Sequence, residues 1–241
     1  MKCIIASDFH IKFNETLEDT ERRALIEDFL NSLIGNTDCL ILAGDIFDLW
    51  AEWDKVIIKQ YFSVLSILSN LKKSGCRLVF LSGNHDFWLE GFLSEQIGFE
   101  IYQDYFTSHF DDKKVFVSHG DLYTKNDLRY QIFRRIIRAN IVKKIFRFIH
   151  PDWSLKIGQK MSRSSRDRKD PQELVMAKEN GLQEKAKQLS SEYDLIVMGH
   201  SHRPKKLEIQ SSLYINCGDW LNNFTYCKLE NGNADLLKFK E

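Results

Sequence analysis

Short apolar runs along the chain alternate with longer amphipathic stretches. Five of these runs predict buried strands, at residues 2–6, 38–43, 77–81, 114–118 and 195–198. Apolar residues at helical spacing predict helices over 16–33 and 56–71, which Gly35 and Gly75 follow. Further strand-like segments lie at 205–209, 213–216, 224–229 and 234–239. We therefore expect an α/β fold completed by antiparallel strands.

A polar motif follows each of the five buried strands. The motifs are Asp8-Phe9-His10, Gly44-Asp45-Ile46-Phe47-Asp48, Gly83-Asn84-His85-Asp86, His119-Gly120-Asp121 and Gly199-His200-Ser201-His202. Ligands of open α/β sheets bind beyond the carboxyl ends of the strands. Because five of the seven histidines lie in these motifs, we expect one shared site at that edge of the fold.

The charge of the chain is balanced overall but unevenly distributed. The 34 Lys and Arg residues equal the 34 Asp and Glu residues, which argues against a uniformly basic nucleic-acid-binding protein. Residues 122–169 nevertheless carry fourteen Lys and Arg against three Asp, a net charge of +11. This segment separates the fourth motif from the fifth and mixes Ile and Phe with its basic residues. We expect one domain over residues 1–241 with an inserted basic and apolar helical cap at 122–169.

The sequence also indicates a cellular location. No apolar run approaches the roughly 18 residues of a membrane span, and the early carboxylate of Asp8 argues against a secretory signal. The five cysteines are odd in number and form no C-x-x-C pair. We therefore expect free thiols in the reducing cytoplasm.

Seven side chains of the motifs are candidate metal ligands. They are Asp8, His10, Asp45, Asn84, His119, His200 and His202. Imidazole nitrogens with carboxylate and amide oxygens suit Mn, Fe, Zn or Co, and the lack of thiolate argues against a structural zinc site. With one bridging carboxylate, the set suffices for two ions about 3.5–4 Å apart, which support in-line displacement at phosphorus. Each motif alone is compatible with an ordinary capped turn, but five in order favour a metal site.

The ordered motifs from Asp8 to His202 resemble those of the calcineurin-like metallophosphoesterases. The resemblance implies a sandwich of two β-sheets flanked by helices. It also implies two ligand groups that share one carboxylate, namely Asp8, His10, Asp45 and His202, and Asn84, His119, His200 and Asp45. It places His85 near the leaving-group oxygen, as proton donor or charge stabiliser, held by Asp86.

A closer similarity, over nearly the whole chain, is to the UDP-2,3-diacylglucosamine diphosphatase family of lipid A biosynthesis. It is carried by the motifs, the insertion, and the segments His150-Pro151-Asp152, Ser162-Arg163-Ser164-Ser165-Arg166 and Asn216-Cys217-Gly218-Asp219-Trp220. That family hydrolyses the substrate's pyrophosphate to UMP and lipid X and usually prefers manganese. The resemblance therefore implies two divalent ions, Mn²⁺ first among them, and a lipid-linked UDP-sugar substrate. The implied substrate contacts are Asn84, His85, Asp127, Arg163, Ser165, Arg166 and His200. The chain departs at His85, where many members carry arginine.

The expected cap suits such a substrate. Its apolar side chains can hold acyl chains, and its basic ones can hold a diphosphate or rest on the anionic cytoplasmic face of the inner membrane. The alternatives are a helical hairpin that only packs on the domain, a calcineurin-like enzyme for a soluble nucleotide or phosphodiester, and a non-catalytic membrane- or partner-binding module. Few stacking aromatics lie in the segment, which argues against a nucleic-acid partner. No pattern indicates an obligate protein partner.

Overall fold

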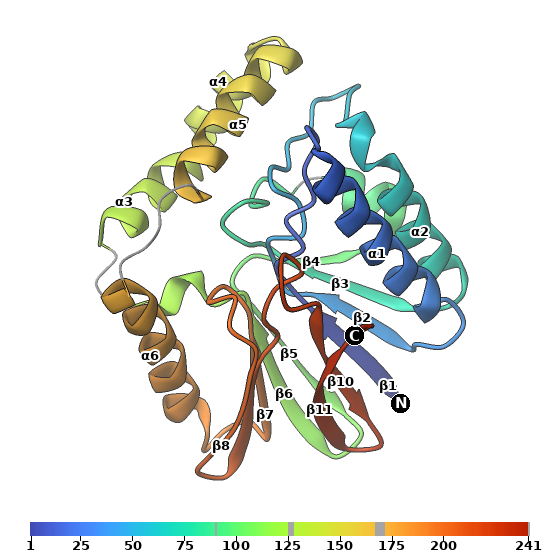
Figure 1. Cartoon of the computed structure of the whole chain (residues 1–241), viewed down its shortest axis with the longest axis vertical. Helices are drawn as coiled ribbons and strands as arrows, with labels where there is room; N and C mark the ends of the chain where they lie inside the picture. Colours follow the sequence, from blue (N-terminus) through green and yellow to red (C-terminus); the bar gives the residue numbers. More distant parts are fainter. Residues whose placement is uncertain (90, 125–127, 167–171, 241) are drawn as a thin grey trace.

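Two β-sheets pack face to face in the computed structural model, which describes residues 1–89, 91–124, 128–166 and 172–240 (Figure 1). The six-stranded sheet has the order β11 (Asn233–Lys238), β10 (Thr225–Glu230), β1 (Lys2–Ala6), β2 (Cys39–Leu42), β3 (Arg77–Leu81) and β4 (Glu100–Tyr102). The five-stranded sheet has the order β5 (Tyr105–Phe110), β6 (Lys113–Ser118), β7 (Leu195–Met198), β9 (Ser212–Asn216) and β8 (Lys205–Ile209). The expected two-sheet sandwich is confirmed.

Helices cover the outer faces of the sandwich (Figure 1). Helices α1 (Leu17–Leu33) and α2 (Phe62–Lys73) pack on the six-stranded sheet, burying Phe29 and Leu68. Helix α6 (Gln172–Leu189) packs on the five-stranded sheet through Leu182 and Ala186. The connecting segments contain the short helical turns η1 (Lys59–Tyr61), η2 (Phe92–Ile97) and η3 (Asp121–Tyr123).

The strands that precede the motifs are buried on both faces, which explains their continuous apolar runs. In β1, Ile5 lies between the sheets, while its neighbour Ile4 faces the helices. Strands β1, β2 and β3 are parallel, as are β6 and β7, so their carboxyl ends meet at one edge. All five cysteines are buried and free, as expected.

Some element boundaries differ from the prediction. The helix expected from residue 56 begins only at Phe62, after the turn η1. Strands β4 and β5, which complete the two sheets at one edge each, were not predicted. Helix α6, which covers the five-stranded sheet, was not predicted either. The first helix ends at Leu33 as expected and begins one residue late, because Thr16 caps it through a capping box with Asp19.

Three helices, which we call the cap helices, extend away from the sandwich (Figure 1). They are α3 (Leu128–Ile137), α4 (Asn140–Phe148) and α5 (Pro151–Arg166). Large apolar side chains are exposed on them, namely Ile132, Ile136, Ile141, Ile145, Phe148, Trp153 and Ile157. Contacts to the body include Phe146 stacked with Trp53 and Arg147 donating to the Glu52 carbonyl at 3.2 Å. None of the helices in the described part of the chain is both long enough and apolar enough to cross a membrane.

Candidate metal centre

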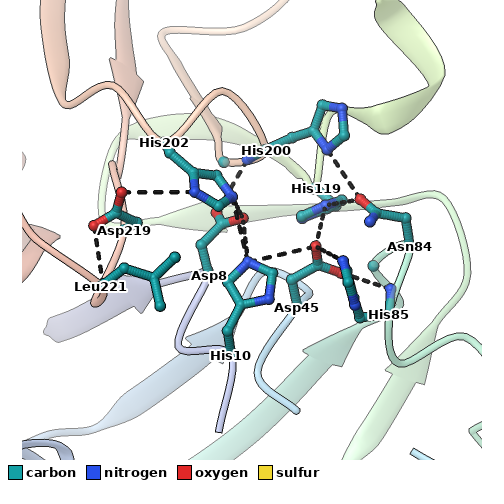
Figure 2. Close-up of polar contacts among 12 residues, drawn as sticks. Asp8, His10, Asp45, Asn84, His85, His119, His200, His202, Asp219 and Leu221 are labelled. Atoms are coloured by element: carbon teal, nitrogen blue, oxygen red, sulfur yellow. Dashed lines mark hydrogen bonds and ion pairs between the residues drawn. The ribbon is translucent and has the colours of Figure 1, made fainter. Parts of the chain in front are cut away.

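All seven predicted ligands converge at the carboxyl ends of strands from both sheets (Figure 2). Asp8 and His10 follow β1, Asp45 follows β2, and Asn84 follows β3. The remaining ligands, His119, His200 and His202, follow β6 and β7 of the second sheet. The site therefore lies where the edges of the two sheets meet.

The first ligand group contains Asp8, His10 and His202. The His202 Nε2 atom lies 3.2 Å from Asp8 Oδ1 and 3.3 Å from His10 Nε2. The His10 Nε2 atom lies 3.7 Å from the same Asp8 oxygen. These three atoms are close enough to bind a single metal ion.

The second ligand group contains Asn84, His119 and His200. The Asn84 Oδ1 atom lies 3.0 Å from His119 Nε2 and 3.0 Å from His200 Nδ1. Asp45 lies between the two groups, with its Oδ2 atom 3.5 Å from His119 Nε2 and 3.8 Å from His10 Nε2. Asp45 is therefore placed to serve both groups.

The backbone that carries the ligands is strained. Asp8, His10, Asp45, His200 and His202 all have a positive φ, between 47° and 67°. This left-handed region is uncommon for residues other than glycine, and such strain persists where the surroundings enforce it, often at functional sites. The strain indicates that ligand geometry has taken precedence over local backbone preference.

Motif glycines leave space for the ligands. A Cβ atom built on Gly83 would lie 2.1 Å from Asp45 Oδ1, and one built on Gly199 would lie 2.5 Å from Asp8 Oδ2. Only glycine permits so close an approach. The glycines of the G-N-H-D and G-H-x-H motifs are therefore required by the packing of the carboxylates.

The hydrogen bonds of His119 show that the residues fit a metal ion. Its Nδ1 atom lies 3.0 Å from the Ala43 carbonyl oxygen and donates to it, so the neutral ring presents a lone pair on Nε2. That lone pair faces Asn84 Oδ1 and Asp45 Oδ2, which are also acceptors. The Oδ1 atom of Asp8 is buried without a hydrogen-bond partner among the described residues. A cation would stabilise these facing acceptors.

The neighbours of the two carboxylates keep them ionised. Burial opposes the charged form, yet His202 and His10 hold the pKa of Asp8 well below its usual range. In the same way, His119 and His85 lower the pKa of the buried Asp45. Two ionised carboxylates among imidazole nitrogens form a donor set that suits an intermediate divalent ion.

His85 lies at the side of this centre, but it is held by a different residue from the one predicted. Its Nδ1 atom lies 3.0 Å from the Asp48 carbonyl oxygen and 3.7 Å from the Asp48 carboxylate. Asp86 instead accepts hydrogen bonds from the backbone N–H groups of Gly83, Asp45, Ile46 and Phe47. The expectation that Asp86 holds His85 is therefore wrong, because the Asp86 carboxylate is occupied in fixing the loops.

The predicted substrate contacts are only partly described. Asn84, His85 and His200 lie in the centre (Figure 2). Arg163, Ser165 and Arg166 belong to α5, but their side chains lie outside the described part. Asp127 lies outside the described residues altogether.

Two further carboxylates contact histidines of the centre, one of them a ligand candidate, and were not given a role from the sequence. Asp219 Oδ2 lies 3.6 Å from His202 Nδ1, while its Oδ1 accepts three successive backbone N–H groups, from Leu221 to Asn223. Asp48 is the other, through its contact with His85. Both were visible as polar residues following strands, Asp48 in the second motif and Asp219 after β9. Such partners fix the ring orientation of a ligand.

A two-sheet sandwich with this ligand set at its edge is the architecture of a metal-dependent phosphoesterase. The chain belongs to the calcineurin-like phosphoesterase family, whose model matches residues 1–204. Among its curated relatives, a UDP-2,3-diacylglucosamine hydrolase of Haemophilus influenzae (strain PittGG) is 29% identical over 98% of this chain and 93% of the relative. The protein of that name from Haemophilus ducreyi is 30% identical over 74% of this chain and 76% of the relative.

A more distant curated relative has the same name, and a solved structure has a similar fold. A UDP-2,3-diacylglucosamine hydrolase of Porphyromonas gingivalis is 24% identical over 93% of this chain and 92% of the relative. Among solved structures, an archaeal phosphodiesterase superposes with a TM-score of 0.51 at 19% identity, covering 98% of this chain and 99% of the other. The structural likeness shows the fold, and the expectation of a metal-dependent hydrolase is confirmed by the family match.

Proposed function

We propose that the chain hydrolyses the pyrophosphate bond of UDP-2,3-diacylglucosamine. Water would add across one P–O bond of the diphosphate, giving UMP and 2,3-diacylglucosamine 1-phosphate, known as lipid X. The observation that carries the proposal is the complete set of seven ligands beside a basic, apolar cap. The printed names of the relatives support the choice of substrate.

The donor set supports two divalent ions, of which we propose Mn²⁺. Asp8, His10 and His202 would hold one ion, Asn84, His119 and His200 would hold the other, and Asp45 would contact both. Bound ions would supply Lewis acidity, which activates a water molecule and neutralises phosphate charge. Nitrogen and oxygen donors without thiolate fit Mn²⁺, although the same donors accept other metals of the first transition series.

His85 has a separate role in the proposal. Because Asp48 occupies its Nδ1 side, the ring turns Nε2 toward the centre, 4.0 Å from Asp45 Oδ2. From this position the doubly protonated ring of His85 can donate its Nε2 proton to the leaving phosphate oxygen or stabilise the charge that develops on it. It does not need to bind a metal to act.

The cap helices supply the features that a lipid-linked diphosphate requires. Their exposed isoleucines can cover acyl chains, and residues 122–169 carry a net charge of +11. The same surface would attract the anionic cytoplasmic face of the inner membrane, where a diacylated substrate resides. We therefore propose a peripheral membrane location for the enzyme.

Direct turnover tests the proposal. Purified chain would be incubated with Mn²⁺ and UDP-2,3-diacylglucosamine, and UMP release would be followed by chromatography. We expect turnover that a chelator abolishes and Mn²⁺ restores. In ¹⁸O-labelled water, we expect the label in UMP, which identifies the phosphorus attacked. Hydrolysis of simple phosphodiesters without UMP release from this substrate would contradict the substrate assignment while leaving the family assignment intact.

A further inference from the structure

Two arginines at the end of α3 reach from the cap to the loops that carry the second ligand group. Arg134 donates through Nε to Asp121 Oδ2 at 2.8 Å, and Asp121 lies two residues after His119. Arg138 donates to the Gly83 carbonyl oxygen at 2.8 Å, and Gly83 immediately precedes Asn84. One end of one helix is thus fixed to the loops of two metal-ligand candidates.

Other contacts strengthen the link to residues 83–88. The guanidinium of Arg138 lies over the ring of Phe87, 5.4 Å from its centroid. The indole Nε1 of Trp88 donates to the carbonyl oxygen of Ile137 at 3.0 Å. The end of α3 is therefore held to this loop by two hydrogen bonds and a cation–π contact.

The pair between Arg134 and Asp121 is largely shielded from water. Asp121 is 4% exposed at its side chain and Arg134 is 14% exposed. Loss of the Arg134 guanidinium would remove the close hydrogen-bond donor of this buried carboxylate, so the loop that carries Asp121 must shift or admit water. A shift there would be transmitted through Gly120 to His119.

We propose that Arg134 and Arg138 are positioning residues that couple the placement of the cap to the geometry of Asn84 and His119. In the seated position of the cap, both loops are held where the ligands converge; when the cap moves, both are released together. The inference rests on the proposed function only in that the cap is taken to engage the substrate. A displacement of about 1 Å at a reacting centre can cost a hundredfold in rate.

The test uses probes that do not depend on the lipid. Arg134→Gln and Arg138→Met would be compared with the unaltered chain for Mn²⁺ binding by calorimetry and for hydrolysis of bis(p-nitrophenyl) phosphate, a small diester without acyl chains. We expect one of two Mn²⁺ sites to weaken about tenfold or more, and kcat for the small diester to fall about ten- to a hundredfold. Arg134→Lys and Arg138→Lys, which keep a charged donor, should restore part of both losses.

A neighbouring arginine provides the control. Arg135 lies on the same helix, is exposed, and makes no hydrogen bond or ion pair to the described residues. Arg135→Met removes the same charge and should leave Mn²⁺ binding and small-diester turnover unchanged. Circular dichroism would show whether each variant is folded. If a neutral variant does not fold, the corresponding lysine variant tests the positioning role in its place.

The outcomes separate this inference from the proposed function. If both variants bind Mn²⁺ normally and differ from the unaltered chain only in a higher KM for UDP-2,3-diacylglucosamine, the arginines contact substrate and the positioning role is wrong. If the chain does not release UMP at all, the substrate proposal fails, but Mn²⁺ binding still decides whether the cap positions the ligands.

Discussion

The Nδ1 atom of His85 lies 3.0 Å from the main-chain carbonyl oxygen of Asp48, the last residue of the G-D-x-x-D motif. A carbonyl oxygen can only accept, so this contact requires the proton to be on Nδ1 in the neutral ring. The Nε2 atom is thereby directed toward the shared carboxylate of Asp45. Two motifs that are separate in the sequence thus determine how one imidazole faces the centre.

We expect His85→Ala to lower kcat by about a hundredfold or more while metal binding persists. The backbone N–H of residue 85, which donates to Asp45 Oδ1 at 2.8 Å, remains in the variant. Asp48→Asn keeps the carbonyl contact and should cost less, about tenfold. Steady-state kinetics and Mn²⁺ titration would measure both effects.

His109→Ala alters an exposed histidine of β5 and serves as the control for His85→Ala. A loss of bound Mn²⁺ in His85→Ala would show that His85 is a metal ligand instead.

Replacement of Asp45 and of Asn84 should have different effects on metal content. Asp45 faces both ligand groups, whereas Asn84 contacts His119 and His200 of the second group. After dialysis against Mn²⁺, elemental mass spectrometry should find about two ions per unaltered chain, close to none for Asp45→Ala and about one for Asn84→Ala. Turnover should fall more than about a hundredfold in both. Retention of both ions in Asp45→Ala would contradict the bridging assignment.

Gly83→Ala should disrupt the centre without changing any ligand. Its Cβ would lie 2.1 Å from Asp45 Oδ1 and 2.3 Å from the Asp45 backbone nitrogen, neither of which can move freely. We expect weaker Mn²⁺ binding and about a hundredfold loss of turnover. Gly91→Ala is the matched control, because the nearest atoms to its Cβ would belong to the flexible carboxylate of Glu95. Equal activity of the two variants would show that the loop can yield.

The apolar pattern predicted the parts of the fold that are buried on both sides. Strands β1, β2, β3 and β7 were found because no position in them needs to face water. Strand β5 was missed because its buried residues, Phe106 and Phe110, are separated by exposed ones, so the segment lacks a continuous apolar run. The exposed residues are Tyr105, Thr107 and His109. The start of α2 was placed too early because Val56 and Ile57 continue its apolar character through a loop.

The ligands could be predicted because each follows a strand directly, so topology alone brings them together. The partners of His85 could not, since neighbouring residues in sequence do not reveal which side chain a ring contacts. Asp86 adjoins His85 in the chain yet turns to the backbone of residues 45–47, and Asp48 reaches the ring from the loop after β2. Contacts between loops depend on backbone direction, which the unusual φ values of this centre determine.

The exposed tip of the cap should bind anionic membranes. Phe148 is 92% exposed at the end of α4, close in sequence to Arg147 and Lys144. We expect the chain to co-sediment with vesicles containing phosphatidylglycerol and to dissociate as salt is raised, since charge attraction is screened over about 8 Å at physiological ionic strength. Phe148→Glu should weaken binding about tenfold or more, because the phenyl ring can no longer enter the interface.

Leu17→Glu is the control for membrane binding. Leu17 is 87% exposed but lies on the first turn of α1, outside the cap, where an acidic residue suits the helix N-terminus. Its binding to vesicles should match that of the unaltered chain. Binding that is absent, or that neither salt nor Phe148→Glu reduces, would favour a cap that serves the substrate alone.

Asp19 should make the stability of the body depend on acidic pH. Although burial opposes its charge, hydrogen bonds from Lys12 and Thr16 lower the pKa of Asp19 to about 2 in the folded chain. An acid whose pKa is lower in the folded state stabilises the fold above its ordinary value, and this stabilisation disappears as pH falls from about 4 to about 2. We expect Asp19→Asn to reduce the free energy of unfolding at pH 7 by about 1 kcal/mol, as for loss of a helix cap. Urea unfolding between pH 7 and pH 2 should show the two stability curves converging toward low pH.

Glu18→Gln, an exposed change in the same helical turn, is the control for this prediction. Its free energy of unfolding should match that of the unaltered chain at each pH. Parallel curves for Asp19→Asn and the unaltered chain would show that the stabilisation comes from packing, not charge.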